Sequence, residues 1–214
     1  MAARTRGRPA LNDAAVASDD ELLEAVLTSF AESGFDGTSI REIARRLDVS
    51  HNLIPQRFGS KRQLWYAAVD YGFGKFDTAM VREGEALGDD DLVVLRGLLV
   101  RTIEMTAANP SLLQIINQEA SQPGPRLDYL FKTFIQPASE FLEVWLNKLV
   151  DEGRVTKTSV ATLYFLVTHG AGGLFALPAL AQQFDTLLTQ KDSATVRAQA
   201  EMVVGIIFDG ILPR

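Results

Sequence analysis

The sequence predicts an all-α protein, and three observations support this fold class. Helix-start signals recur along the chain, because Ser18, Ser39 and Ser60 are each followed three residues later by Glu or Gln, the pattern of a capping box. Apolar residues then follow at i, i+3, i+4 and i+7 spacing, as on one face of a helix. No segment alternates apolar and polar residues in the manner of a half-buried strand.

Three short helices and the start of a longer one are predicted in the N-terminal third of the chain. The first follows Ser18 and ends at Gly34, the second follows Ser39, the third follows Ser50, and the longer helix begins at Ser60. Their apolar stripes are Leu22, Leu23, Val26, Leu27 and Phe30 in the first helix, Ile40, Ile43, Ala44 and Leu47 in the second, and Leu64, Trp65, Ala68 and Val69 in the longer one.

The remainder of the chain predicts longer helices, separated by short polar connections. We expect helices near 90–107, 111–119, 125–151, 158–181 and 193–210. The connections at 109–110, 121–125 and 151–153 are rich in Pro, Gly, Asn and Asp, which disfavour helix.

Composition limits the kind of protein this can be. The chain has 214 residues, of which 47% are hydrophobic, so a sizeable core is expected. There is no cysteine, which excludes disulfides, thiolate catalysis and cysteine metal sites and is consistent with a cytoplasmic location. The first ten residues, MAARTRGRPA, are basic, but no apolar stretch follows them, which argues against a secretory signal.

The charge is unevenly distributed. The net charge of −6 comes entirely from residues 66–214, with 12 basic and 18 acidic residues, whereas residues 1–65 contain nine of each. The basic residues of the segment 37–62 are Arg41, Arg45, Arg46, Arg57, Lys61 and Arg62, against only Glu42 and Asp48. A local excess of this kind fits contact with phosphate groups, and it fits a solvated helix face equally well.

Residues 40–58 have the spacing of a helix-turn-helix, in which a second helix can enter the DNA major groove. Pro55 lies five residues after Ser50, and a proline inside a helix costs about 3 kcal/mol or more. Two interpretations stay open: the second helix bends at Pro55, or its regular part begins near Pro55 after a looser turn.

The run TSIREIARRLDVSHNLIPQRFGSKRQLW, residues 38–65, preceded by LLEAVLTSFAESGFDG, resembles the N-terminal domain of the TetR family of transcriptional regulators. The resemblance covers about residues 18–70, and the rest resembles the family in length and helix layout. It departs at Asp48, where the family usually has glycine, at Asn52, where a small residue is usual, and at Pro55, where tyrosine is frequent. Asp tolerates the left-handed conformation that such a turn requires.

The resemblance implies a homodimer that binds a near-palindromic double-stranded DNA operator, with a small, fairly apolar effector causing release. The implied organisation is a flexible basic arm at 1–17, a helix-turn-helix DNA-binding domain at 18–65, and a helical effector-binding and dimerisation domain at 66–214. The expected DNA contacts within the helix-turn-helix domain are Thr38, Ser39, Arg41, Ser50, His51, Asn52, Leu53, Gln56, Arg57 and Lys61.

The basic arm offers a further DNA contact. Its stretch Arg6-Gly7-Arg8-Pro9 resembles the core of an AT-hook, whose arginines lie in the minor groove of A·T-rich DNA. We therefore expect Arg6 and Arg8 to contact DNA, with a disordered basic tail as the alternative.

Effector and dimer residues are expected in the C-terminal part. The expected effector pocket residues are Met105, Phe134, Trp145, Phe165 and His169, for which the alternative is an ordinary core aromatic or a structural histidine. The expected dimer interface residues are Leu163, Val167, Gly170, Leu174, Val196, Val203 and Ile207.

Two other classes of protein remain as alternatives: an all-α enzyme, and a helical membrane or partner-binding protein. The uncharged stretch 158–184 is long enough to span a bilayer, but no basic cluster flanks it. The motifs HExxH, GxSxG and GxxxxGK[ST] are missing, and Asp89-Asp90-Asp91 is better explained by the favourable interaction of acids with a helix start than by Mg²⁺. The sequence therefore predicts no enzyme activity, no cofactor, no metal site and no membrane span.

Overall fold

The computed structural model describes residues 18–184 and 192–213, so the expected arm, with Arg6 and Arg8, lies outside the described residues. All regular structure in the described part is helical, which confirms the all-α class. The first six helices are α1 (Asp19–Gly37), α2 (Ile40–Arg46), α3 (Leu53–Phe58), α4 (Lys61–Leu87), α5 (Asp91–Ala108) and α6 (Ser111–Glu119). They are followed by α7 (Pro125–Leu130), the π-helical segment η1 (Phe131–Ile135), α8 (Gln136–Asp151), α9 (Val160–Phe165), the π-helical segment η2 (Leu166–Ala171), α10 (Gly173–Ala176), α11 (Pro178–Phe184) and α12 (Ser193–Ile211).

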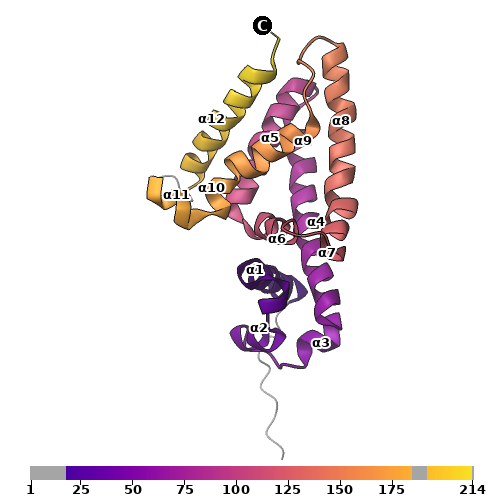
Figure 1. Ribbon diagram of the computed structural model, residues 1–214, viewed down its shortest axis with the longest axis vertical. Helices are drawn as coiled ribbons and strands as arrows, with labels where there is room; N and C mark the ends of the chain where they lie inside the picture. The colour runs from indigo at the N-terminus through magenta and orange to yellow at the C-terminus, as the bar shows by residue number, and fades with distance from the viewer. Residues whose placement is uncertain (1–17, 185–191, 214) are drawn as a thin grey trace, which may run out of the picture.

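The helices form a small group at one end of the molecule and a larger group at the other. Figure 1 shows α1, α2 and α3 gathered around the beginning of α4, which then runs into the larger group. Helices α6 and α7 lie between the two groups, and α5, α8, α9 and α12 lie beyond them, toward the C-terminus. The single long helix α4 therefore joins the two ends of the molecule.

The predicted helix starts are present as side-chain caps. Ser18 and Glu21 form a reciprocal capping box, with the Glu21 backbone N–H donating to Ser18 Oγ (3.2 Å) and the Ser18 N–H donating to Glu21 Oε2 (2.8 Å). Ser60 and Gln63 form a second such box at the start of α4. Each box satisfies backbone N–H groups that have no partner within the helix itself.

Two clusters of buried side chains hold the fold together. The N-terminal core consists of Leu22, Val26, Leu27, Phe30, Ala31, Ile43, Ala44, Ile54, Leu64, Trp65, Ala68, Val69, Ile115 and Leu130. The C-terminal core consists of Leu95, Leu99, Val100, Ile103, Ala107, Leu146, Leu149, Val155, Leu163, Val167, Ala171, Phe175, Val196, Ala200, Val204, Ile207, Phe208 and Ile211. Because α6 and α7 contribute Ile115 and Leu130 to the N-terminal core, the larger group packs directly on the smaller one.

The expected helix at 158–181 is broken into four segments, which corrects the sequence prediction. Leu177 precedes Pro178 and adopts φ −122° and ψ 57°, because the proline ring disfavours a helical conformation for the residue before it. A Cβ atom at Gly172 would collide with the Thr168 carbonyl oxygen, so the end of η2 requires glycine. Within residues 18–184 and 192–213, no helix has both the length and the apolar character needed to cross a membrane.

Candidate nucleic-acid interface and adjoining cavity

Helices α2 and α3 are held at a fixed angle by a tight turn. Asp48 has φ 52°, the left-handed conformation expected from its place in the turn, and the Val49 N–H donates to the Ala44 carbonyl at 3.0 Å. Ile43 and Ile54, which are 2% and 0% exposed, anchor the two helices in the N-terminal core. The turn and the two anchors together form the predicted helix-turn-helix.

Pro55 is accommodated because α3 begins later than a helix capped by Ser50 would. The helix starts at Leu53, so Pro55 is its third residue, where the backbone N–H would have no intrahelical acceptor in any case. A turn precedes it, in which the Leu53 N–H donates to the Ser50 carbonyl at 2.9 Å. Of the two interpretations left open by the sequence, the structure selects the looser turn followed by a regular helix.

A polar strip on the outer side of α2 and α3 is open to solvent. Its exposed residues are Ser39, Arg41, Ser50, His51, Asn52, Pro55 and Gln56. Arg41 has no hydrogen bond or ion pair to any residue of the described chain, so its guanidinium is available to a ligand. This strip contains six of the ten residues that the sequence assigned to DNA contact within the helix-turn-helix domain.

Two other cationic residues of the expected interface are tethered by neighbouring groups. The Arg57 guanidinium lies 2.9 Å from Asp19 Oδ1, an ion pair between α3 and the first residue of α1. Lys61 Nζ donates to the Asp36 carbonyl at 3.2 Å and lies 5.0 Å from the centre of the Phe35 ring. Both side chains are therefore held at the rim of the strip, beside the N-terminus of α4.

Two expected contacts are placed differently from the prediction. Thr38 is 5% exposed, and its Oγ1 donates toward the Gly34 and Ser29 carbonyls at 2.7 and 3.1 Å, so its hydroxyl closes the end of α1 instead of facing outward. Leu53 is half-buried and packs against the N-terminal core. From the sequence alone, a hydroxyl or apolar residue at a helix start can either face DNA or pack inside the domain. The packing in the structure distinguishes these two roles.

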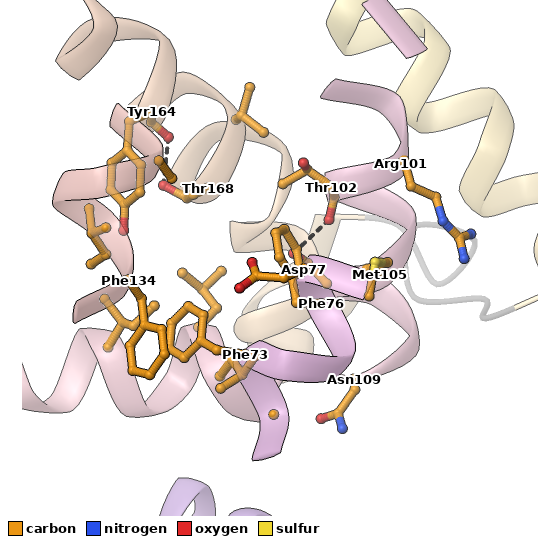
Figure 2. A pocket seen from close by; sticks show the side chains of 18 of the residues that line it. Phe73, Phe76, Asp77, Arg101, Thr102, Met105, Asn109, Phe134, Tyr164 and Thr168 are labelled. Atoms are coloured by element: carbon orange, nitrogen blue, oxygen red, sulfur yellow. Dashed lines mark hydrogen bonds between the residues drawn. The ribbon is translucent and has the colours of Figure 1, made fainter. Parts of the chain in front are cut away.

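A cavity of about 570 Å³ lies between the two cores, and Figure 2 shows its wall. The wall is mainly apolar and takes residues from α1, α4, α5, α6, η1, α8, α9 and η2. Aromatic rings form one side, where Phe73 of α4 stacks on Phe134 of η1 with the ring centres 4.1 Å apart. The volume lies within the range of small-molecule sites in proteins.

The cavity includes two of the five expected pocket residues. Met105 and Phe134 line it. Trp145 packs against the C-terminal core, Phe165 is 59% exposed on the outer surface, and His169 hydrogen-bonds Asn117 of α6 at 2.9 Å, so these three lie outside the cavity wall. Helical spacing identifies the elements around a cavity but not the side chains that face it.

Sequence reasoning missed the part of the wall formed by α4 and by α1. Phe73, Phe76 and Asp77 project into the cavity from α4, and Glu24 and Leu27 border it from α1. Burial raises the pKa of the Asp77 carboxyl, and it also raises the pKa of the Tyr164 hydroxyl on the facing wall. The i, i+3 spacing of Phe73 and Phe76 places both aromatic side chains on one face of the long helix, and this spacing could have identified them as candidates for the cavity wall.

The expected dimer residues lie mostly inside the chain. Leu163, Val167, Val196 and Ile207 are at most 6% exposed and belong to the C-terminal core. Leu174 and Val203 are partly buried against that core, and only Gly170 is exposed. The structure corrects the choice of side chains, because the apolar stripe of each helix faces the chain's own core.

A different apolar surface covers the outside of the same helices. Its members on α9, η2 and α12 are Phe165, Leu166, Met202 and Ile206, which are 59%, 46%, 59% and 66% exposed. We call these four residues the outer apolar face. Exposed large apolar side chains of this kind are candidates for contact with other molecules.

Comparison with known proteins agrees with this geometry. Residues 22–68 match the family described as "Bacterial regulatory proteins, tetR family". A segment of 50 residues is 46% identical to the "HTH-type transcriptional repressor Rv3405c" of Mycobacterium tuberculosis (strain ATCC 25618 / H37Rv), covering 23% of this chain and 27% of that protein. A longer segment of 135 residues is 29% identical to the "HTH-type transcriptional repressor KstR2" of Rhodococcus jostii (strain RHA1), covering 60% of this chain and 62% of that protein. These matches span about a quarter and under two thirds of the two relatives' lengths.

Solved structures share the fold over nearly the whole chain. The ketosteroid transcriptional regulator KstR2 of Mycobacterium tuberculosis superposes with a TM-score of 0.67 at 19% identity, covering 93% of this chain and 97% of that one. A TetR transcriptional regulator from Chloroflexus aurantiacus J-10-FL superposes with a TM-score of 0.66 at 18% identity, covering 90% and 95%. The agreement therefore extends beyond the helix-turn-helix to the C-terminal helices.

Proposed function

We propose that this chain, whose residues 22–68 match the tetR family of bacterial regulatory proteins, represses transcription as a homodimer on a near-palindromic DNA operator and is released by a small, fairly apolar effector. The observation that carries this proposal is that α1, which supports the DNA-facing helices, also borders the cavity through Glu24 and Leu27. A molecule in the cavity would therefore contact the helix that supports α2 and α3. The names of the two curated relatives, both repressors, support repression.

The polar strip supports DNA contact in two ways. His51, Asn52 and Gln56 are exposed at and beside the start of α3, where side chains can reach base edges in the major groove. Asn52 in particular can form the paired hydrogen bonds that identify adenine. Arg41 and Lys61 lie at the rim and suit phosphate contacts, which position a protein on DNA without identifying its sequence.

Coupling between the cavity and the DNA-facing helices is supported by a hydrogen-bonded junction around Glu24. Its Oε1 accepts from Asn109 Nδ2 at 2.7 Å, and its Oε2 accepts from Lys75 Nζ at 2.9 Å, so one α1 carboxylate joins α4 to the end of α5. An effector that fits better when this junction is rearranged lowers DNA affinity by the same free energy.

Two further contacts connect the same groups of helices. Gln118 Nε2 of α6 donates to the Ala31 carbonyl of α1 at 2.5 Å. The Tyr129 hydroxyl of α7 donates to Asp70 of α4 at 2.6 Å, and burial, together with Asp70, raises the pKa of Tyr129 to about 12. The hydroxyl consequently stays protonated and able to donate throughout the neutral range.

A homodimer is supported by the outer apolar face. Two copies that bury this face against each other would form a four-helix contact and would place two α3 helices on related half-sites. Replacing Ile206, which is 66% exposed, by Glu is expected to yield monomers in sedimentation analysis and weaker operator binding. If the Ile206→Glu protein stays dimeric, the dimer interface does not include the outer apolar face.

The direct test is selection of bound fragments from genomic DNA at a stated salt concentration, followed by affinity measurement on the recovered sequence. We expect the recovered fragment to have two-fold symmetry. Arg41→Ala and Lys61→Ala should weaken binding roughly uniformly across sequences, and Asn52→Ala should relax the sequence preference, with an effect of about 1–3 kcal/mol for each variant. Equal affinity for all fragments and for random duplex would exclude sequence-specific regulation.

A further inference from the structure

Asp77 differs from the other charged residues that line the cavity. Among residues 18–184 and 192–213, five charged side chains border it: Glu24, Lys75, Asp77, Arg101 and Glu104. Glu24 pairs with Lys75 at 2.9 Å, and Arg101 pairs with Glu104 at 3.3 Å. Asp77 makes no hydrogen bond or ion pair with any residue of the described chain. In the described part of the cavity wall, Asp77 is thus the one carboxylate without a basic partner.

Asp77 belongs to a cavity wall that is mainly apolar, although the residue as a whole is exposed to solvent. It projects from α4 between Phe73 and Phe76, and Figure 2 shows its carboxylate pointing into the cavity, while the Arg101 guanidinium points away from it. Its partial burial raises the pKa of the Asp77 carboxyl. A carboxylate in this position is stabilised by a bound donor and above all by a cation, because a hydrogen bond between two ionised groups is the stronger kind.

We propose that Asp77 selects, as the ligand of this cavity, an apolar molecule that carries a protonated amine. The inference rests on the proposed effector function of the cavity and specifies the chemistry of the effector. The ammonium group would donate to the Asp77 carboxylate, and the apolar body would lie in the cavity beside the stacked rings of Phe73 and Phe134.

Two features of the wall favour this ligand over an acid of the same shape. Aromatic faces at Phe73, Phe76 and Phe134 attract a cation and not an anion. The basic residues Lys75 and Arg101 are already paired with acids, so they offer a carboxylate ligand little compensation for its repulsion by Asp77. Tyr164, whose hydroxyl makes no hydrogen bond within the described residues, adds a polar contact on the facing wall.

The test uses three probes that share one skeleton and differ in one group: phenylbutylamine, phenylbutanol and phenylbutanoic acid. Their affinities for the full chain are measured by isothermal titration calorimetry at neutral pH. The amine is expected to bind at least about tenfold more tightly than the acid, with the alcohol between them. Equal or tighter binding of the acid, or no binding of the amine, would overturn the proposal.

Variants then assign the preference to this side chain. Asp77→Asn should abolish the preference for amine over acid, and Asp77→Glu should keep most of it. Glu85→Gln is the matched control, because it removes one acid from an exposed position of the same helix that does not line the cavity. An undiminished preference in Asp77→Asn, with unchanged circular dichroism, would contradict the assignment.

The outcome is separable from that of the proposed function. Operator affinity of the wild-type protein without any probe tests DNA recognition alone. A wild-type protein that prefers the amine but binds no DNA selectively would support the ligand chemistry and refute the regulator. A selective DNA binder that prefers the acid would refute only the ligand chemistry.

Discussion

The two ends of the molecule are built from the same kind of element but differ in how completely they are packed. Around α3, the anchoring residues Phe30, Ile54 and Trp65 are at most 1% exposed and belong to the N-terminal core. Beside the C-terminal core, a cavity of about 570 Å³ stays open between the surrounding helices. The difference fits the proposed function, because a helix that enters a DNA groove must be held at one angle, whereas an effector site must leave space for its ligand.

The largest expected effect comes from truncating matched apolar residues in the two regions. Ile54→Ala should lower the free energy of unfolding of the N-terminal unit by about 2–5 kcal/mol, because the removed atoms leave a hole in a closed core. Met105→Ala should cost less than about 1 kcal/mol, because Met105 already borders open space and the cavity only grows. Urea denaturation of both variants, monitored by circular dichroism, measures the difference.

Equal losses in the two variants would contradict the comparison, because they would mean that the cavity wall is as tightly packed as the N-terminal core. Ile103→Ala is the control for the C-terminal group of helices. Ile103 is 1% exposed on α5, the helix that carries Met105, so its truncation should cost as much as that of Ile54.

How far the sequence predicts this structure depends on whether the signal is local. The caps at Ser18 and Ser60 and the left-handed turn at Asp48 follow from residues within a few positions, and all three are present. The ion pair between Asp19 and Arg57 joins residues 38 positions apart, and no local pattern announces it.

The faces of α12 are a second example of a feature that the local sequence does not determine. Val196, Val203 and Ile207 form a helical stripe, but the spacing does not say whether that stripe meets the chain's own core or a partner. The structure places Val196 and Ile207 in the core and leaves Met202 and Ile206 outside. Such choices depend on tertiary packing, which a single helix pattern does not contain.

A smaller effect is expected from the caps, and it sharpens the contrast between the regions. Ser60→Ala removes a reciprocal box at the start of α4 and should cost about 1 kcal/mol. Ser159→Ala removes a single bond of 3.4 Å at the start of α9, beside the cavity, and should cost less. Thermal unfolding of the two alanine variants, each compared with the corresponding Ser→Thr variant, measures which loss of stability is larger. A larger loss for Ser159→Ala than for Ser60→Ala would contradict the prediction.

Pro55 should matter even less for stability. Because it occupies the third position of α3, Pro55→Ala restores no lost helical bond and should change the free energy of unfolding by no more than about 0.5 kcal/mol. A gain near 3 kcal/mol on removing the proline would show instead that it interrupts a longer helix. A change in DNA affinity that accompanies unchanged stability would show that Pro55 acts at the exposed polar strip, of which it is a member.

The smallest effect, and the one with the clearest sign, concerns two acids in contrasting places. Hydrogen bonds from Ser18 lower the pKa of Glu21 below its usual value, so its contribution to stability is present above that value and is lost as pH falls through the folded-state pKa. Burial raises the pKa of Asp77, so the folded state binds a proton at this carboxyl more readily than the unfolded state does. Stability therefore falls as the pH rises from the unfolded-state pKa to the folded-state pKa. Asp77→Asn should therefore raise the melting temperature at neutral pH and lose this advantage in acid, while Glu21→Gln should do neither. Melting curves of both variants across the acidic and neutral range measure this, and a lower melting temperature for Asp77→Asn at neutral pH would mean that Asp77 has a stabilising partner in solution.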